Sequence, residues 1–66
     1  MEYATKLKEL REQRNMTQRY VAKELNLTPG AVAKWELGIS VPTVENLIAL
    51  ADLLGCTTDQ LLGRDG

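Results

Sequence analysis

The chain has 66 residues, with 8 basic and 9 acidic side chains, one cysteine and no histidine. This length allows one domain, near the lower size limit at which a single core is stable without staples. One cysteine excludes an intrachain disulfide and fits a reducing, cytoplasmic setting, while the lack of histidine excludes the usual zinc sites and Ser-His or Cys-His catalytic arrangements. No apolar run reaches membrane-spanning length, and the amino end is not a signal peptide. We therefore expect a soluble intracellular protein with no catalytic site, metal, cofactor or membrane partner.

The charge is unevenly distributed along the chain, although the net charge is only −1. Residues 1–34 hold seven basic and four acidic side chains, a net of +3, whereas residues 35–66 hold one basic and five acidic side chains, a net of −4. Such asymmetry is typical of a surface with one side that faces an anion. A charged helix face that is merely solvated gives the same pattern.

Apolar residues at helical spacing predict a first helix over about residues 2–14, which buries Tyr3, Leu7 and Leu10 and ends near Asn15. The same spacing predicts two short helices over about residues 18–25 and 29–37. All three are amphipathic, so their apolar faces are expected to meet in one core.

The segment between the two short helices is typical of a tight turn. Asn26 tolerates the left-handed conformation that ends a helix, Thr28 can cap the next helix, and Pro29 suits the first position inside it. A turn of about three residues makes the two helices cross steeply. Ala22 is small enough to let such a crossing close.

Residues 38–42 are predicted to form a loop, after which Thr43 caps a fourth helix over about residues 44–54 that Gly55 ends. This helix is the main core contributor, with an apolar stripe formed by Val44, Leu47, Ile48, Leu50, Ala51 and Leu54. The core as a whole is predicted to comprise Leu7, Leu10, Val21, Ala22, Leu25, Val32, Trp35, Leu47, Ile48, Ala51, Leu54 and Leu61.

A last helix over about residues 58–62 is indicated by Thr57 and Gln60, which have capping-box spacing. Cys56 precedes the cap and can pack on Leu61, so we interpret it as a packing residue and not as a reactive thiol. The predicted domain therefore covers residues 1–62, with residues 63–66 as a frayed tail or the start of a linker.

Together these residues resemble the helix-turn-helix domains of the lambdoid phage repressor and Cro type, often called XRE-like. The resemblance covers about residues 7–62 and is carried by Met16-Thr17-Gln18, Ala22, Asn26-Leu27-Thr28, Val32, Lys34-Trp35-Glu36, Gly38, Pro42 and the apolar helix from Leu47 to Leu54. It implies an all-α, compact five-helix repressor-like domain, with the helix-turn-helix formed by the second and third helices. It also implies sequence-specific binding of double-stranded DNA by a dimer, in a bacterial or phage transcriptional regulator.

The family positions that hold the DNA backbone fall at the start of the second helix. Gln18 corresponds to the position that binds a backbone phosphate, and Arg19 and Lys23 can flank the same strand. Positions that read bases fall on Thr28, Pro29, Gly30, Ala31, Ala33 and Lys34. With Thr17 and Ser40, these residues form the predicted DNA-binding set.

The third helix departs from the family pattern, because several reading positions usually carry long amides or hydroxyls. Pro29, Gly30 and Ala31 have no side chain that can hydrogen-bond a base edge, so we expect the third helix to make few direct contacts with bases. Ala31 or Ala33 can contact a thymine methyl. Lys34 can reach guanine acceptors or a phosphate and is the best candidate for a base contact.

The resemblance also pairs Arg11 with Glu36, which would join the first helix to the third. The alternative is an exposed arginine with no fixed partner. For assembly, Leu62 and the loop residues Ile39 and Val41 are the apolar surface left over once the core is filled, and we expect a weak homodimer through one of these regions. Two functional alternatives stay open, namely a protein interaction module of the same fold and a DNA-targeting domain of a longer ligand-sensing protein.

Overall fold

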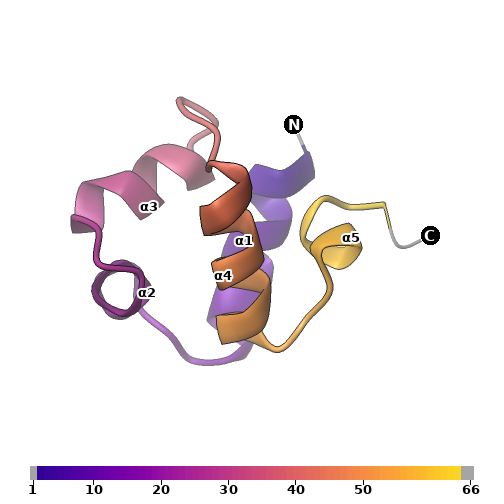
Figure 1. Cartoon of the computed structure of the whole chain (residues 1–66), viewed down its shortest axis with the longest axis horizontal. Helices are drawn as coiled ribbons and strands as arrows, with labels where there is room; N and C mark the ends of the chain where they lie inside the picture. Colours follow the sequence, from indigo (N-terminus) through magenta and orange to yellow (C-terminus); the bar gives the residue numbers. More distant parts are fainter. Residues whose placement is uncertain (1, 65–66) are drawn as a thin grey trace.

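A computed structural model describes residues 2–64, and within them the chain forms five α-helices joined by short connections (Figure 1). The helices are α1 (Glu2–Gln13), α2 (Gln18–Glu24), α3 (Pro29–Glu36), α4 (Val44–Leu54) and α5 (Thr58–Leu61). The predicted all-α five-helix architecture is confirmed. Four of the five helices end one residue earlier than the sequence indicates, and for α2, α3 and α5 the extra predicted residue is the C-cap.

Threonine side chains fix the start of three helices. The hydroxyls of Thr17, Thr43 and Thr57 accept hydrogen bonds from the backbone N–H groups of Tyr20, Asn46 and Gln60, at 3.0, 3.1 and 3.0 Å. The Gln60 side chain also accepts from the Thr57 backbone N–H at 2.8 Å, which completes the predicted capping box. Each hydroxyl satisfies a backbone donor that has no partner inside its helix.

Thr28 occupies the same capping position before α3, but its side chain makes no capping hydrogen bond. The prediction that Thr28 caps α3 is therefore wrong for its hydroxyl. The physical reason is that the Ala31 N–H, which the hydroxyl would accept, donates instead to the Thr28 backbone carbonyl at 3.0 Å. The Thr28 side chain is exposed and its oxygen is left for another donor.

A left-handed residue follows each of the five helices, with Gly38 after α3 at φ 75° and Gly63 after α5 at φ 74°. Asn26 follows α2 with φ 59°, as predicted, and Asn15 follows α1 with φ 56°. Gly55 ends α4 with φ 67°, a conformation that favours glycine because it lacks a Cβ atom. These residues let the chain reverse within a few positions, so every helix can return to one core.

The core lies where all five helices converge. In Figure 1, α4 lies in front of α1, with α2 and α3 to one side and α5 to the other. The buried apolar cluster consists of Tyr3, Ala4, Leu7, Val21, Ala22, Val32, Trp35, Leu50, Leu54 and Leu61. Burial of Trp35 agrees with its predicted packing role.

The predicted apolar stripe of α4 needs two corrections. Ile48 was assigned to the core but remains 50% exposed, and Val44, one turn earlier, is 73% exposed. Leu50 belongs to the predicted stripe, although not to the list of core residues, and it is fully buried. Because α4 is apolar over most of its circumference, its periodicity does not say which side meets the other helices.

Other predicted core residues pack at the margin of the cluster. Leu10, Leu25 and Leu47 are partly buried against it. Leu62, which the sequence indicated as surface left over after the core is filled, also packs there. Among the residues described, the large apolar side chains that are exposed are Tyr20, Leu37, Ile39, Val41, Val44 and Ile48.

The carboxyl end of the domain continues the hydrogen bonding of α5. Gly63 and Arg64 donate backbone N–H groups to the carbonyls of Gln60 and Asp59, at 3.1 and 2.8 Å. Residues 65–66 of the predicted tail lie outside the described residues. Before α5, Cys56 packs partly buried against the core, and this burial raises the pKa of its thiol. Among the helices described, none combines the length and apolar character needed to cross a membrane.

Candidate DNA-binding site

The pair α2 and α3 is built as a tight unit around the turn between them. Leu27 donates its backbone N–H to the Ala22 carbonyl at 2.8 Å, which folds the turn back on α2. Ala22, Val21 and Val32 have no exposed surface, so the two helices meet through small and β-branched side chains. The small residue predicted at the crossing is thus buried in the contact.

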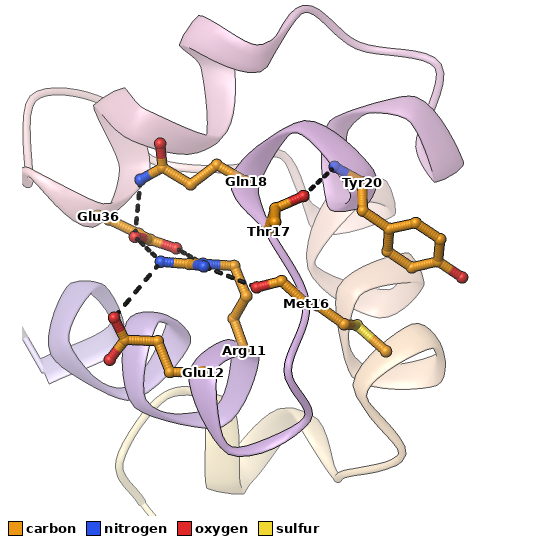
Figure 2. A network of polar contacts seen from close by, with 7 residues as sticks. All are labelled: Arg11, Glu12, Met16, Thr17, Gln18, Tyr20 and Glu36. Atoms are coloured by element: carbon orange, nitrogen blue, oxygen red, sulfur yellow. Dashed lines mark hydrogen bonds and ion pairs between the residues drawn. The ribbon is translucent and has the colours of Figure 1, made fainter.

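A polar network ties this unit to α1 (Figure 2). Arg11 donates from Nε to Glu36 Oε2 at 2.7 Å and from Nη2 to Glu36 Oε1 at 3.1 Å. Its Nη1 donates to the Met16 carbonyl at 2.7 Å. The predicted pair of Arg11 with Glu36 is thus present, and one guanidinium joins α1, the α1–α2 connection and the end of α3.

The pair is buried, with 10% of the Arg11 side chain and 4% of the Glu36 side chain exposed. The hydrogen bonds to Glu36 raise the pKa of Arg11, outweighing the opposing effect of burial. Within residues 2–64, every buried side-chain nitrogen or oxygen that the structure describes has a hydrogen-bond partner. A buried ion pair with all its polar atoms satisfied fixes geometry more than it adds net stability.

Gln18 is the third member of this network. Its Nε2 donates to Glu36 Oε1 at 2.9 Å. Figure 2 shows the amide reaching Glu36 while its oxygen points away from the carboxylate. Nothing in the sequence pattern indicated this contact, because Gln18 and Glu36 are separated by 18 positions. The side chain at the predicted phosphate-holding position is therefore oriented by the same carboxylate that binds Arg11.

The start of α3 presents small and exposed groups. Thr28, Pro29 and Gly30 are exposed, Ala31 and Ala33 are half-buried, and Lys34 is exposed in the last turn. A Cβ atom added at Gly30 would meet nothing within 4 Å, so packing within the domain does not require this glycine. The backbone of this turn is open to a large ligand.

The first turns of the helices differ in charge. The first turns of α2 and α3 contain no acidic side chain, whereas α4 has Glu45 and α5 has Asp59. The positive end of the helix dipole favours anions, and an acidic residue in the first turn competes for it. The starts of α2 and α3 are therefore the more favourable places for an external anion.

The remaining predicted site residues lie in different environments. Thr17 caps α2, and Arg19 and Lys23 are exposed on its outer face. Ser40 is half-buried, and its carbonyl accepts from the Tyr3 hydroxyl at 2.7 Å. The structure thus gathers Thr17 and Gln18 at the start of α2 and Thr28 to Ala31 at the start of α3, while Ser40 lies beyond the other end of α3.

Arg14, just after α1, has a structural role that the sequence analysis does not predict. Its Nη1 donates to the Leu10 carbonyl at 3.2 Å, and its Nε donates to the Leu54 carbonyl at the end of α4. This basic side chain joins the ends of two helices, where carbonyls lack partners and cations are favoured. A position near the end of a helix was the only sequence signal for this role.

In Figure 1, α2 is seen end-on while α3 lies across it, beyond a short turn. Two helices arranged in this way, with a third helix joined to them by a buried ion pair, define a helix-turn-helix domain of the repressor type. Residues 7–61 match the profile of the helix-turn-helix family. The chain belongs to this family, in the XRE-like group.

Several relatives carry names of transcriptional regulators. The chain is 37% identical over 65 residues to the HTH-type transcriptional activator BcrR of Enterococcus faecalis, covering 98% of this chain and 32% of that protein. It is 40% identical over 60 residues to the HTH-type transcriptional regulator AnsR of Bacillus subtilis, covering 91% of this chain and 52% of that protein. The chain thus spans about a third to a half of the length of these relatives.

Two solved structures share the fold. The P22 c2 repressor in complex with synthetic operator 9T is 28% identical, with a TM-score of 0.89 over 98% of both chains. The structure of FeII HppE in complex with substrate is 37% identical, with a TM-score of 0.83 over 89% of this chain and 34% of that one. The same domain thus occurs in a repressor bound to an operator and within a much longer chain.

Proposed function

We propose that this chain binds double-stranded DNA sequence-specifically through the starts of α2 and α3, in the cytoplasm of a bacterium or in a phage-infected cell, as a transcriptional regulator. The observation that carries the proposal is the open first turn of α3. Its capping hydroxyl is unused, it has no acidic side chain, and its first residues are small and exposed. A helix fits the major groove, and its free N–H groups attract phosphate.

Each predicted contact has a physical role in this proposal. Gln18, held by Glu36, still has its second amide N–H for a backbone phosphate. Arg19 and Lys23 add counter-charge along the same strand, and Thr28 offers a free hydroxyl. Base edges are left to Lys34 and to apolar contacts from Ala31 and Ala33 with thymine methyl groups.

Because one domain contacts few base edges, we expect two copies to bind together on the DNA. A single α3 covers only a few base pairs, so specificity requires two copies about one helical turn apart on a site with two-fold symmetry. Each copy offers only about four to six phosphate contacts, so its binding is weak and salt-sensitive. Two linked contacts reinforce one another, so the dimer forms mainly on the site.

Fluorescence anisotropy on a random-sequence duplex at low and moderate salt tests the proposal. We expect binding to fall by roughly two to three orders of magnitude between 50 and 200 mM salt, because each phosphate contact releases counterions. Arg19→Ala is expected to lower the salt slope by about 1, whereas Lys8→Ala, an exposed charge on α1, leaves it unchanged. Absence of binding at both salt concentrations would contradict a DNA role.

The net charge of −1 and the apolar surface beyond α3 favour one competing function, a protein interaction module. Such a module would show no retention on DNA at either salt concentration. A second alternative is a DNA-targeting domain of a longer ligand-sensing protein. It is supported by the relatives and HppE, which are much longer than this chain. Such a domain would still bind DNA as this 66-residue unit.

A further inference from the structure

An open cleft lies where the connection after α1 leads into α2. Its volume is about 370 Å³, which is within the range of sites for small ligands. We term it the Tyr20 cleft, and its lining consists of Arg14, Asn15, Met16, Thr17 and Tyr20. Figure 2 shows the side chains of Met16 and Tyr20 pointing away from Glu36. The cleft is therefore separate from the polar network around that carboxylate.

The Tyr20 cleft offers an apolar wall to an occupant. Tyr20 is 44% exposed, and among the residues described it is the only large apolar side chain exposed outside residues 37–48. Met16 is half-buried and packs against the core, so it supplies a fixed apolar surface beside the ring. Aromatic rings and methionine sulfur both make favourable contacts with a flat aromatic group.

Arg14 gives the cleft a positive charge. Its Nε and Nη1 donate to the Leu54 and Leu10 carbonyls, which hold the guanidinium beside the ends of α4 and α1. Both ion pairs found within residues 2–64 belong to Arg11, so Arg14 has no carboxylate partner there. The two N–H groups of its Nη2 have no hydrogen-bond acceptor in the same range. A half-buried guanidinium that is held in place and keeps free donors favours a carboxylate ligand.

We propose that the Tyr20 cleft binds a small aromatic carboxylate and that its occupation weakens DNA binding. The ring of the ligand lies against Tyr20 and Met16, and its carboxylate accepts hydrogen bonds from Arg14. The effect on DNA rests on the proposed function, because Thr17 lines the cleft and precedes Gln18, the proposed phosphate contact. A negative charge added this close to a phosphate repels it, so ligand and DNA weaken each other reciprocally.

A small molecule suits this cleft better than a macromolecule. A protein partner would find little apolar surface around it, because the exposed neighbours Arg19 and Lys23 on α2 are charged. DNA as the occupant gives a different result. If Arg14 bound a phosphate, Arg14→Gln would lower the salt slope of DNA binding by about 1 in the absence of any ligand.

A nuclear magnetic resonance titration with cinnamate, a flat aromatic carboxylate, tests the site without DNA. We expect saturable amide shifts that are largest within residues 14–20, with a dissociation constant on the order of 1 mM. The neutral analogue cinnamamide is expected to bind at least about fivefold more weakly, because it lacks the charge that Arg14 favours. Largest shifts within residues 37–48, absence of saturation, or equal binding of the two probes would overturn the proposal.

Three variants assign the contacts in the same titration. Tyr20→Ala removes an exposed ring, so we expect it to keep the fold and to weaken cinnamate binding at least about fivefold. Arg14→Gln is expected to weaken cinnamate but not cinnamamide, a difference that a merely structural role would not produce. Lys8→Ala, an exposed charge on α1 outside the cleft, is expected to change neither. Unchanged cinnamate binding by Tyr20→Ala would overturn the proposal even if Arg14→Gln does not fold.

Fluorescence anisotropy on a duplex selected from a random pool tests the effect on DNA. We expect saturating cinnamate to lower the DNA affinity about fivefold, and Tyr20→Ala to abolish this effect. Unchanged affinity, or an equal loss in sodium acetate at the same concentration, would contradict regulation through the cleft. A salt slope lowered by about 1 in Arg14→Gln without cinnamate would assign Arg14 to a phosphate and overturn the proposal. If no duplex binds, the proposed function fails, while the titration without DNA still decides the site.

Discussion

At its amino end α3 begins with Thr28, Pro29 and Gly30, which are small and exposed, whereas at its carboxyl end it leads into Leu37 and Ile39, which are large and exposed. The first turn has an unused capping hydroxyl and no acidic group. The other end has a hydrogen-bonded loop covered by aliphatic side chains. The same short helix therefore suits a polyanion at one end and an apolar protein surface at the other.

The polar network explains how both ends keep a fixed orientation. Glu36 accepts from Arg11 of α1 and from Gln18 of α2, one position before Leu37. Because the network lies near the end of α3, it holds the Gln18 amide of α2 against that end of the helix. Variants of these residues can therefore show whether the two ends have separate functions.

The largest expected effect follows loss of the buried cation. Arg11→Ala leaves the Glu36 carboxylate buried without its partner, which is expected to cost about 3–5 kcal/mol of unfolding free energy. In so small a domain this is a large share of the total stability. Urea unfolding of Arg11→Ala beside the exposed control Arg19→Ala measures it. Equal midpoints for the two variants would mean that the network does not hold α3.

The next effect separates positioning of the DNA from reading of its sequence. Gln18→Ala is expected to weaken binding to selected and random duplexes alike, because a phosphate carries no sequence. Lys34→Ala is expected to lose about 1–3 kcal/mol more on the selected duplex if it binds guanine. Anisotropy titrations at one salt concentration measure both. Equal losses for Lys34→Ala on the two duplexes would reassign it to a phosphate contact.

A smaller effect compares the two capping threonines. Thr43→Ala removes the hydroxyl bonded to Asn46 N–H and is expected to cost about 1 kcal/mol of stability. Thr28→Ala removes no such bond and is expected to change stability by less than about 0.5 kcal/mol while weakening DNA binding. Thermal unfolding and anisotropy of both variants give the comparison. A full capping loss at Thr28 would show that its hydroxyl is not free.

The smallest effect concerns the alanines of α3. Replacement of single thymines by deoxyuridine in the selected duplex removes one methyl group each. At a position that Ala31 or Ala33 contacts, we expect a loss of about 0.8 kcal/mol, as for one buried methyl group. Affinities that are insensitive to every such replacement would rule out this mode of readout.

Much of the fold could be predicted because its local signals agree. Thr17, Thr43 and Thr57 mark helix starts through their own hydrogen bonds, and Asn26 and Gly55 mark helix ends through their left-handed backbone. These signals depend on residues within four positions of each other. Together with the apolar spacing, they predict every helix to within one residue of its observed ends.

Contacts across the fold were less accessible to sequence reasoning. The pair of Arg11 and Glu36 was expected only through the family resemblance, and the contact of Gln18 with Glu36 was not expected. The exposure of Ile48 and the burial of Leu50 depend on which side of α4 the other helices cover. The unused hydroxyl of Thr28 depends on a backbone carbonyl that takes its donor.

The most direct test of the central claim is a nuclear magnetic resonance titration of the isotopically labelled chain with the selected duplex. DNA binding through the open first turn predicts the largest amide shifts at Gly30, Ala31 and Gln18, with smaller shifts at buried Leu50. Shifts confined to residues 37–48, or no shift at saturating duplex, would contradict the assignment of DNA binding to the start of α3.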